Sequence, residues 1–433
     1  MGEKDFEKII NNLKDENQEL QNTVDELSIL NDIATAISST QSIEQIESLI
    51  IQKCVKHLNV EEGVVMLLTQ PEEDRPFETM IRKKNSLIDS LPFRLDDQLM
   101  GHILHNKTSI LVNDFEKTDL FDISAMKDSP IRSLLCVPMF VKGKMIGMIS
   151  VFNKIGDEGF GETDKRLLSI CATQSAQVIE NARLYNEEKT LHKLKEEMDL
   201  AKDIQQKLLP KSLPQIEGYD IASINISAKD VGGDFYDFIP LPGNKLAFCL
   251  GDVSGKGVPA ALIMANLMAI LRTQILLTGS CGNCLTESNK FLFNSIESDK
   301  FATLFLGILD QVSGDLTYSS AGHENPIIIS DKYEIAKLET EDIVLGIQPE
   351  YDYTEKTINL RIGDTLIIYS DGIIEAENAN EQQFGDFRLA DIISQNISLS
   401  AAKMISVIFS ELDNYTLGGT QLDDKTLTII KRG

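Results

Sequence analysis

The run from 245 to 257, KLAFCLGDVSGKG, most constrains what this chain can fold into. Its first half is apolar and predicts a buried strand that ends at Asp252. A glycine-spaced turn follows, and a helical pattern begins at Val258, with Pro259 in the first turn, where proline is tolerated. A carboxylate is thus offered where a buried strand ends and the backbone turns sharply. Such a setting suits a hard cation such as Mg²⁺ or Mn²⁺.

Acids recur beside other predicted strands. Asp371 follows one apolar strand, Asp423 and Asp424 precede another, and Asp234 lies beside two glycines in the run GGDFYDF. Each Asp-Gly or Asp-Asp pair, taken alone, is most simply a turn. Four such acidic settings in one chain favour a metal site over four unrelated turns.

Six motifs in order carry a family resemblance over roughly the second half of the chain. Together they closely resemble the PPM-type (protein phosphatase 2C-like) family, in its bacterial branch related to SpoIIE and RsbU. The agreement of all the motifs in order makes the resemblance highly specific. The motifs are GGDFYDF, GDVSGKG, ATLFLGILD, AGHENP, IIYSDGIIEA and LDDKTLTII.

The resemblance implies a β-sandwich flanked by helices and a serine/threonine protein phosphatase that uses two Mn²⁺ or Mg²⁺ ions. Hydrolysis of a phosphate monoester needs a nucleophilic water, charge neutralisation and an exit for the leaving oxygen. A two-metal site supplies all three. A shared carboxylate with further acids around it suits these ions, whereas His and Cys would select zinc.

The same resemblance assigns roles to individual positions. Asp252 would bridge both metals, and the carbonyl of Val253 would bind one of them. Asp371 and Asp423 would complete the protein ligands of the other metal. Asp234 would lie beside the first metal, directly or through water.

Other polar residues of the motifs have less certain places. Asp424 directly follows Asp423 and is expected to support the site rather than to bind a metal directly. The sequence still leaves open which of the two faces the metals, so both are candidate ligands. Asp237 need not face the site, because in a strand it need not share the face of Asp234. His323 is expected to be structural or near the site rather than to transfer a proton, and Lys256 is a candidate helper. No clear Arg matches the phosphate-binding Arg of the eukaryotic phosphatases.

Composition excludes several classes of function. The formal net charge of −26 argues against a nucleic-acid-binding surface, which needs a basic footprint. No uninterrupted apolar run reaches the length of a membrane span, and the first residues lack a signal-peptide core. The cysteines are scattered, as in a reduced intracellular chain. We therefore expect a cytoplasmic protein with no membrane and no nucleic-acid partner.

Heptad patterns predict helical coils at residues 1–29 and 184–210. In the first, Asn17 at a core position favours a parallel dimer in register. The alternatives are a single amphipathic helix packed on the next domain and, for 184–210, a solvated single linker helix. We prefer a homodimer whose linker carries a rotation or register shift. The core positions of the linker are Leu184, Leu191 and Met198 in one row, and Leu194, Ala201 and Leu208 in the other.

Residues 30–183 read as an α/β module with a hairpin turning at Gly143 and a helix starting near Thr163. The segment SLLCVPMFVKGKMIGMISVFNK resembles a GAF domain, a sensory module with a small-molecule pocket. Asn153, Lys154 and Asp164 match most of a pattern seen in cyclic-nucleotide-binding GAF domains. The simpler explanation is that they hold the hairpin-to-helix turn. The ligand, a small molecule or a protein, is not readable from the sequence.

Residues 211–433 are expected to form the catalytic domain of an α/β and α+β multidomain protein. Strands are predicted at 220–227, 246–250, 301–310, 315–320, 327–329, 365–369 and 426–431, and helices at 258–278, 284–296 and 401–415.

The function we expect is a metal-dependent phosphoserine/phosphothreonine protein phosphatase controlled by a GAF sensor. By family analogy its substrate is a phosphorylated anti-sigma-factor antagonist, whose dephosphorylation would release a sigma factor by partner switching. The alternative is a ligand-sensing dimeric scaffold whose phosphatase-like domain binds partners without catalysis. The intact acids at 252, 371 and 423 argue against it.

Overall fold

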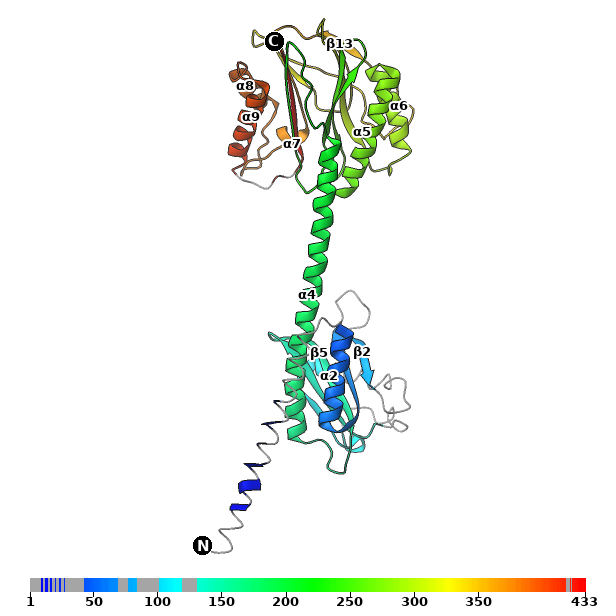
Figure 1. Cartoon of the computed structure of the whole chain (residues 1–433), viewed down its shortest axis with the longest axis vertical. Helices are drawn as coiled ribbons and strands as arrows, with labels where there is room; N and C mark the ends of the chain where they lie inside the picture. Colours follow the sequence, from blue (N-terminus) through cyan, green and yellow to red (C-terminus); the bar gives the residue numbers. More distant parts are fainter. Residues whose placement is uncertain are drawn as a thin grey trace. The chain divides into compact units, whose positions relative to one another are not determined.

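The computed structural model of the chain divides into two compact units, Met1–His192 and Lys193–Gly433, which are described separately (Figure 1). It describes residues 43–68, 77–83, 101–118, 131–417, 421 and 423–433, with separate positions between 9 and 27. The described positions between 9 and 27 are helical. The rest of the predicted coil at 1–29 lies outside the described residues, so that prediction stays open.

The first unit is built on one antiparallel sheet with strand order β2-β1-β5-β4-β3. The predicted hairpin is confirmed, with Gly143 in the left-handed region at its turn. Residues 101–106 form a further helical turn. The elements are α2 (Ile43–Leu58), β1 (Val60–Leu68), β2 (Phe77–Lys83), β3 (Ile110–Val112), η1 (Phe115–Lys117), β4 (Leu134–Val141), β5 (Lys144–Lys154) and α4 (Glu162–Leu208).

Alternation along β4 gives this sheet two apolar faces. Leu135 and Val137 pack with α2 and the first half of α4, whereas Leu134 and Cys136 point into a second cluster with Phe115. A period of two along a strand places neighbouring side chains on opposite faces. The sheet is therefore buried on both sides, which explains the nearly continuous apolar run of β4.

Asn153 and Lys154, at the end of β5, make contacts that hold neighbouring segments together. Lys154 Nζ lies 2.6 Å from Asp164 Oδ1 and donates to the carbonyl of Leu58 at 2.9 Å. Asn153, at a φ of 58°, accepts from the backbone N–H of Arg132 at 2.7 Å. These contacts hold the turn from β5 into α4, which supports the structural explanation of the cyclic-nucleotide-like pattern.

Helix α4 is longer than either helix predicted for its span. It runs unbroken for 47 residues, so the predicted helix from Thr163 and the predicted linker 184–210 are one element. The first part is buried against the sheet of the first unit. Beyond that part, Leu184, Leu191 and Leu194 are 51–61% exposed. They form a row of apolar side chains that the described residues leave exposed to solvent.

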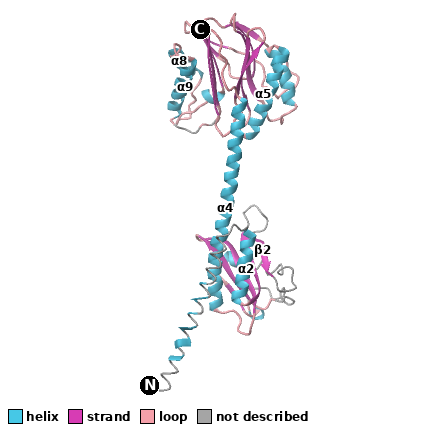
Figure 2. Ribbon diagram, viewed as in Figure 1, coloured by secondary structure: helices cyan, strands magenta, loops and turns pink. Residues whose placement is uncertain are grey.

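The second unit is a sandwich of two five-stranded sheets, ordered β13-β10-β9-β8-β7 and β12-β11-β14-β15-β6 (Figure 2). The strands are β6 (Tyr219–Ile226), β7 (Phe235–Leu241), β8 (Lys245–Val253), β9 (Ala302–Asp310), β10 (Asp315–Ala321), β11 (Ile327–Ile329), β12 (Ile335–Lys337), β13 (Lys356–Asn359), β14 (Thr365–Tyr369) and β15 (Lys425–Arg432). The helices are α5 (Val258–Thr278), α6 (Cys281–Phe293), α7 (Asp371–Ile374), α8 (Asp386–Gln395) and α9 (Ala401–Thr416).

Three apolar clusters give the sandwich four layers. Phe248, Phe305 and Ile368 belong to the cluster between the sheets. α5 and α6 cover the outer face of the first sheet, and α8 and α9 cover the outer face of the second. This is the predicted β-sandwich flanked by helices.

Helix α5 is the described helix that is long and apolar enough to cross a membrane by length and composition. Met264, Leu267 and Leu271 pack into the core against the sheet, while Leu262 and Leu277 are exposed. A core helix of a folded domain passes the same test, so the observation gives weak support for a membrane span.

Candidate metal centre

The predicted acids meet at one end of the sandwich because of strand direction. β8 and β14 run toward that end, so Asp252 and Asp371 lie where these strands finish. β7 and β15 start there, so Asp234 and Asp423 lie just before them. Each sheet thus supplies one strand end and one strand start, and electrostatic coupling links Asp252 to the other three acids.

Asp234 is held across the two sheets. Its side chain is 3% exposed, and Oδ2 accepts a hydrogen bond from Thr426 Oγ1 at 2.6 Å. Asn225 Nδ2 donates both to Thr426 Oγ1, at 2.8 Å, and to the carbonyl of Asp234, at 3.1 Å. The carboxylate therefore has a fixed orientation, set by residues of β6 and β15.

The cluster carries more negative charge than its surroundings balance. Burial, and then repulsion from Asp371, raise the pKa of Asp252 to about 7. Burial, and then repulsion from Asp252, raise the pKa of Asp234 well above its ordinary value. Burial and Asp423 likewise raise the pKa of Asp371. The shared cause of these raised pKa values is buried negative charge without a compensating cation.

Asp424 is tied to the backbone of the GGD loop. Its Oδ1 accepts from the N–H of Ala228 at 2.7 Å, and its Oδ2 accepts from the N–H groups of Gly233 at 2.7 Å and Asp234 at 3.3 Å. Both oxygens are therefore occupied by backbone donors in the described structure. This arrangement suits a residue that positions the loop.

Gly233 permits a close approach of two backbones. A Cβ at this position would lie 2.5 Å from the carbonyl oxygen of Val253 and 3.1 Å from Asp252 Oδ1. Neither distance is compatible with an ordinary side chain at Gly233 without a shift. The glycine therefore explains why the loop can lie directly against the end of β8.

Asp423 has different partners from Asp424. Its Oδ2 lies 2.8 Å from Lys256 Nζ, and the two side chains are 39% and 41% exposed. The hydrogen bond to Asp423 raises the pKa of Lys256. Of the two adjacent acids, Asp423 is the one whose carboxylate is accessible beside Asp371.

The donor set fits a hard divalent cation in its chemistry. Carboxylates and a carbonyl supply only oxygen ligands, as Mg²⁺ and Mn²⁺ prefer, and a cation would relieve the repulsion within the cluster. Among the residues that the structure describes, no three acidic, His or Cys side chains already converge on one ion position. A coordination shell would therefore need side-chain adjustment and water.

Two other residues weighed in the sequence lie in different settings. Asp237 Oδ2 pairs with Arg272 Nε at 2.6 Å, so the Asp237 carboxylate is bound to helix α5. His323 is buried, its Nδ1 is 2.8 Å from Thr303 Oγ1, and its Nε2 has no hydrogen-bond partner among the described residues. Burial lowers the pKa of His323 to about 4, so the ring is neutral and is a poor proton donor at physiological pH.

Gln205, near the end of α4, is a residue that the sequence did not single out. Its Nε2 donates to the carbonyl of Gly232 at 2.7 Å, and its Oε1 accepts from the N–H of Gly232 at 3.1 Å. The neighbouring carbonyl of Leu208 accepts from Arg272 Nη2 at 2.8 Å. A glutamine on a charged helix has no sequence signal for such a role, because only the fold brings the loop to it.

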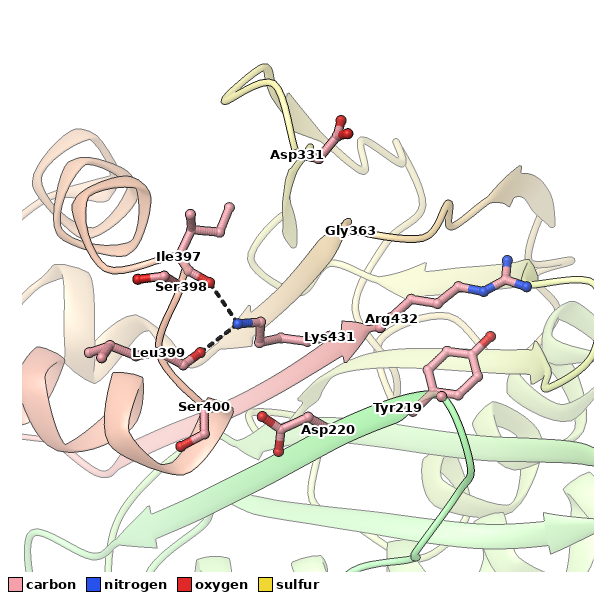
Figure 3. A pocket seen from close by; sticks show the side chains of 12 residues that line it. Tyr219, Asp220, Asp331, Gly363, Ile397, Ser398, Leu399, Ser400, Lys431 and Arg432 are labelled. Atoms are coloured by element: carbon pink, nitrogen blue, oxygen red, sulfur yellow. Dashed lines mark hydrogen bonds between the residues drawn. The ribbon is translucent and has the colours of Figure 1, made fainter.

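One cavity in the second unit is separate from these acids. A cavity of about 530 Å³ is lined by Tyr219, Asp220, Lys431, Arg432 and the loop before α9 (Figure 3). Lys431 Nζ donates to the carbonyl of Ile397 at 2.6 Å. None of the candidate metal ligands lines this cavity, and its charged groups serve local contacts, so the chemistry is not expected there.

Comparison with known proteins identifies the family. A sequence profile described as "Stage II sporulation protein E (SpoIIE)" matches residues 242–433. Phosphoserine phosphatase RsbU of Bacillus subtilis is 31% identical over 257 residues, which are 57% of this chain and 75% of RsbU. The chain belongs to the SpoIIE/RsbU family of PP2C-like phosphatases. A GAF domain profile matches residues 40–180, which confirms the predicted GAF domain of this family member.

Other matches of this SpoIIE/RsbU-family chain agree with its fold. Protein IcfG of Synechocystis is 30% identical over 264 residues, which are 54% of this chain and 41% of IcfG, so the chain spans less than half of that relative. The SiaA-PP2C domain of Pseudomonas aeruginosa has a TM-score of 0.50 at 22% identity, over 56% of this chain and 98% of that domain. This last likeness shows the fold alone.

Proposed function

We propose that the chain is a divalent-metal-dependent phosphatase of phosphoserine and phosphothreonine proteins. The observation that carries the proposal is the meeting of Asp234, Asp252, Asp371 and Asp423 from both sheets at one end of the sandwich. Their raised pKa values indicate a surplus of negative charge that divalent cations would compensate. Membership of the phosphatase family supports the same reaction.

The ligand roles follow from accessibility and contacts. Asp252 would be shared by two Mn²⁺ or Mg²⁺ ions, and the carbonyl of Val253 would bind one of them. Asp371 and Asp423, both partly buried, would complete the protein ligands of the other ion. Asp234, which accepts from the hydroxyl of Thr426, would lie beside the first ion. Asp424 would have a positioning role rather than coordinate directly, since its oxygens already accept backbone hydrogen bonds.

When bound, the two ions supply an activated water, hold the phosphoryl oxygens and stabilise the leaving group. The protein's own residues orient the carboxylates and determine whether they carry protons. Thr426 fixes the direction of the Asp234 carboxylate, and Asp424 keeps the GGD loop against β8. Asp252, with a pKa of about 7, must lose any bound proton before it can act as a ligand. Nδ1 of neutral His323 lies 2.8 Å from the hydroxyl oxygen of Thr303 on β9.

The test is release of phosphate from a phosphoserine-bearing antagonist protein, with Mn²⁺ or Mg²⁺ and with EDTA. Turnover that needs the metal and is lost in Asp252→Asn supports the proposal. Asp331→Asn, an acid beside the separate cavity, is the matched control and should retain full turnover. No turnover of this substrate or of an aryl phosphate would favour the non-catalytic scaffold.

We propose a phosphorylated anti-sigma-factor antagonist as the substrate. The support is similarity to RsbU, a phosphoserine phosphatase by name, over 75% of its length. The accessible position of Asp371 and Asp423 suits a phosphorylated side chain presented by a folded protein. Turnover of free phosphoserine at the same kcat/KM as the phosphoprotein would contradict a protein substrate.

We further propose a cytoplasmic homodimer regulated through α4 by an unidentified small molecule or protein at the GAF domain. The exposed row Leu184, Leu191 and Leu194 supports a second copy as its cover, because leucines at heptad spacing pack knobs-into-holes. Light scattering should give a dimer that Leu191→Glu dissociates. One residue inserted near Glu188 should disturb regulation while basal turnover persists.

A further inference from the structure

Among the residues that the structure describes, Lys256 is a basic residue paired with a candidate metal ligand, Asp423. Its ammonium lies 2.8 Å from Asp423 Oδ2, and it also interacts with Asp371. The residue sits between Gly255 and Gly257, both in the left-handed region, at φ of 97° and 80°. The two glycines allow a tight turn directly after β8. This turn places the lysine beside the acid cluster.

The position of this ammonium conflicts with the role proposed for Asp423. Asp423 Oδ1 accepts from the N–H of Asp424 at 2.9 Å, so the oxygen that Lys256 contacts, Oδ2, is the one left for a cation. A divalent cation at Oδ2 would repel the ammonium and compete with it for the same lone pairs. The lysine is 41% exposed and has a flexible four-carbon stem, so it can leave Asp423 without a change in the fold. After displacement, its charge would remain at the entrance, where a phosphate group must pass.

An ammonium at that point suits an incoming phosphate. Lysine is a compact, strongly hydrated charge that binds phosphate oxygens as a point charge. Arg272 on helix α5 pairs with Asp237, which is not a proposed metal ligand, and with the carbonyl of Leu208, whereas Lys256 pairs with the proposed ligand Asp423. Lys256 is therefore the better placed of the two for this role.

We propose that Lys256 is a displaceable counter-ion: it neutralises Asp423 before the metal binds, and then binds the phosphoryl oxygens of the substrate. The inference rests on the proposed function, since it needs Asp423 to take a divalent cation. It makes Lys256 a substrate-binding residue for phosphate monoesters and, in the empty site, a competitor of the metal.

The neighbouring lysine offers a matched control. Lys300 Nζ lies 3.9 Å from where a Cβ on Gly255 would be, so it flanks the same turn. It pairs with Asp299 at 3.1 Å, which is outside the acid cluster. Lys300→Gln removes one positive charge from this region while leaving the Asp423 contact in place.

The experiment uses the full chain as wild type, Lys256→Gln, Lys256→Arg and Lys300→Gln. Mn²⁺ affinity is measured by electron paramagnetic resonance without substrate, and inorganic phosphate affinity by calorimetry on the Mn²⁺-loaded protein. Lys256→Gln should bind Mn²⁺ up to roughly 5-fold more tightly, as expected for loss of one exposed ion pair. Its phosphate affinity should fall roughly 10-fold, with loss of one charge-assisted contact.

Steady-state kinetics with an aryl phosphate give an independent readout. Lys256→Gln should raise KM more than it lowers kcat, Lys256→Arg should restore most of the phosphate affinity, and Lys300→Gln should match wild type. Unchanged Mn²⁺ and phosphate affinities in Lys256→Gln would overturn the proposal, as would a wild type that binds no Mn²⁺. If the predicted affinity changes occur but wild type hydrolyses no phosphate monoester, the counter-ion role stands and the phosphatase function fails.

Discussion

The adjacent acids Asp423 and Asp424 should separate into two different roles when each is changed to Asn. Asp424 accepts hydrogen bonds from three backbone N–H groups, through both of its oxygens. Asn has only one carbonyl oxygen, so at least one of these N–H groups would lose its acceptor. Asp423 instead contacts the ammonium of Lys256 in a half-exposed pair.

The magnitudes follow from these contacts. An orphaned buried donor costs about 1–3 kcal/mol, and the lost charge weakens the remaining bonds, so Asp424→Asn should lower the free energy of unfolding by about 2–4 kcal/mol. Asp423→Asn removes one exposed ion pair and should change the free energy of unfolding by at most about 1 kcal/mol. Its effect should fall on Mn²⁺ affinity, because a proposed ligand loses its charge.

The assay follows urea unfolding of the full chain, with Mn²⁺ affinity measured on each variant. Hydrogen exchange at the amides of Ala228 and Gly233 adds a local readout, and it should quicken in Asp424→Asn but not in Asp423→Asn. The reasoning is refuted if Asp424→Asn is as stable as wild type and loses Mn²⁺ binding while Asp423→Asn retains it. That outcome would make Asp424 the metal ligand.

Three further changes test other parts of the site. Gly233→Ala places a Cβ 2.5 Å from a carbonyl oxygen, so it should cost about 1–3 kcal/mol of stability and weaken Mn²⁺ binding, as unfolding and metal titrations would detect. The pKa of His323 is about 4 in the fold and about 6.5 when unfolded, so the unfolded chain binds more protons below pH 6.5. Stability should fall by up to about 3 kcal/mol from pH 6.5 to 4, and His323→Gln should abolish that loss in pH-dependent unfolding. Gln205→Ala should quicken hydrogen exchange in the GGD loop, whereas Gln206→Ala, at the exposed neighbouring position, should not. Equal exchange rates in the two variants would contradict a role of Gln205 in holding Gly232.

Much of the architecture was predictable because strong local patterns agree with it. The strand of 245–253, the glycine turn and the helix from Val258 form as expected, with Pro259 in the first turn. Strand β7 does not appear among the predicted strands, and it contains Pro240, a residue type that most sheet positions disfavour. The proline is tolerated there because β7 is an edge strand of its sheet, where one row of N–H groups needs no partner.

The acids of the site were identifiable, but their orientations were not. Asp423 and Asp424 are neighbours in an irregular stretch, and no periodicity states which one turns inward. The answer depends on the N–H of Gly233, some 190 positions earlier in the chain, which only the fold brings to Asp424. The neutral state of His323 likewise follows from burial rather than from its motif.

The reciprocal hydrogen bonds between Gln205 and Gly232 decide where this protein can be divided. A fragment begun at the prolines 210 and 214 would keep every acid yet lose the amide that holds the loop before Asp234. A chimaera that joins this phosphatase to a foreign sensor should therefore place its joint upstream of residue 202, so that the last turns of α4 travel with the sandwich. The last turns of α4 therefore belong structurally to the catalytic domain.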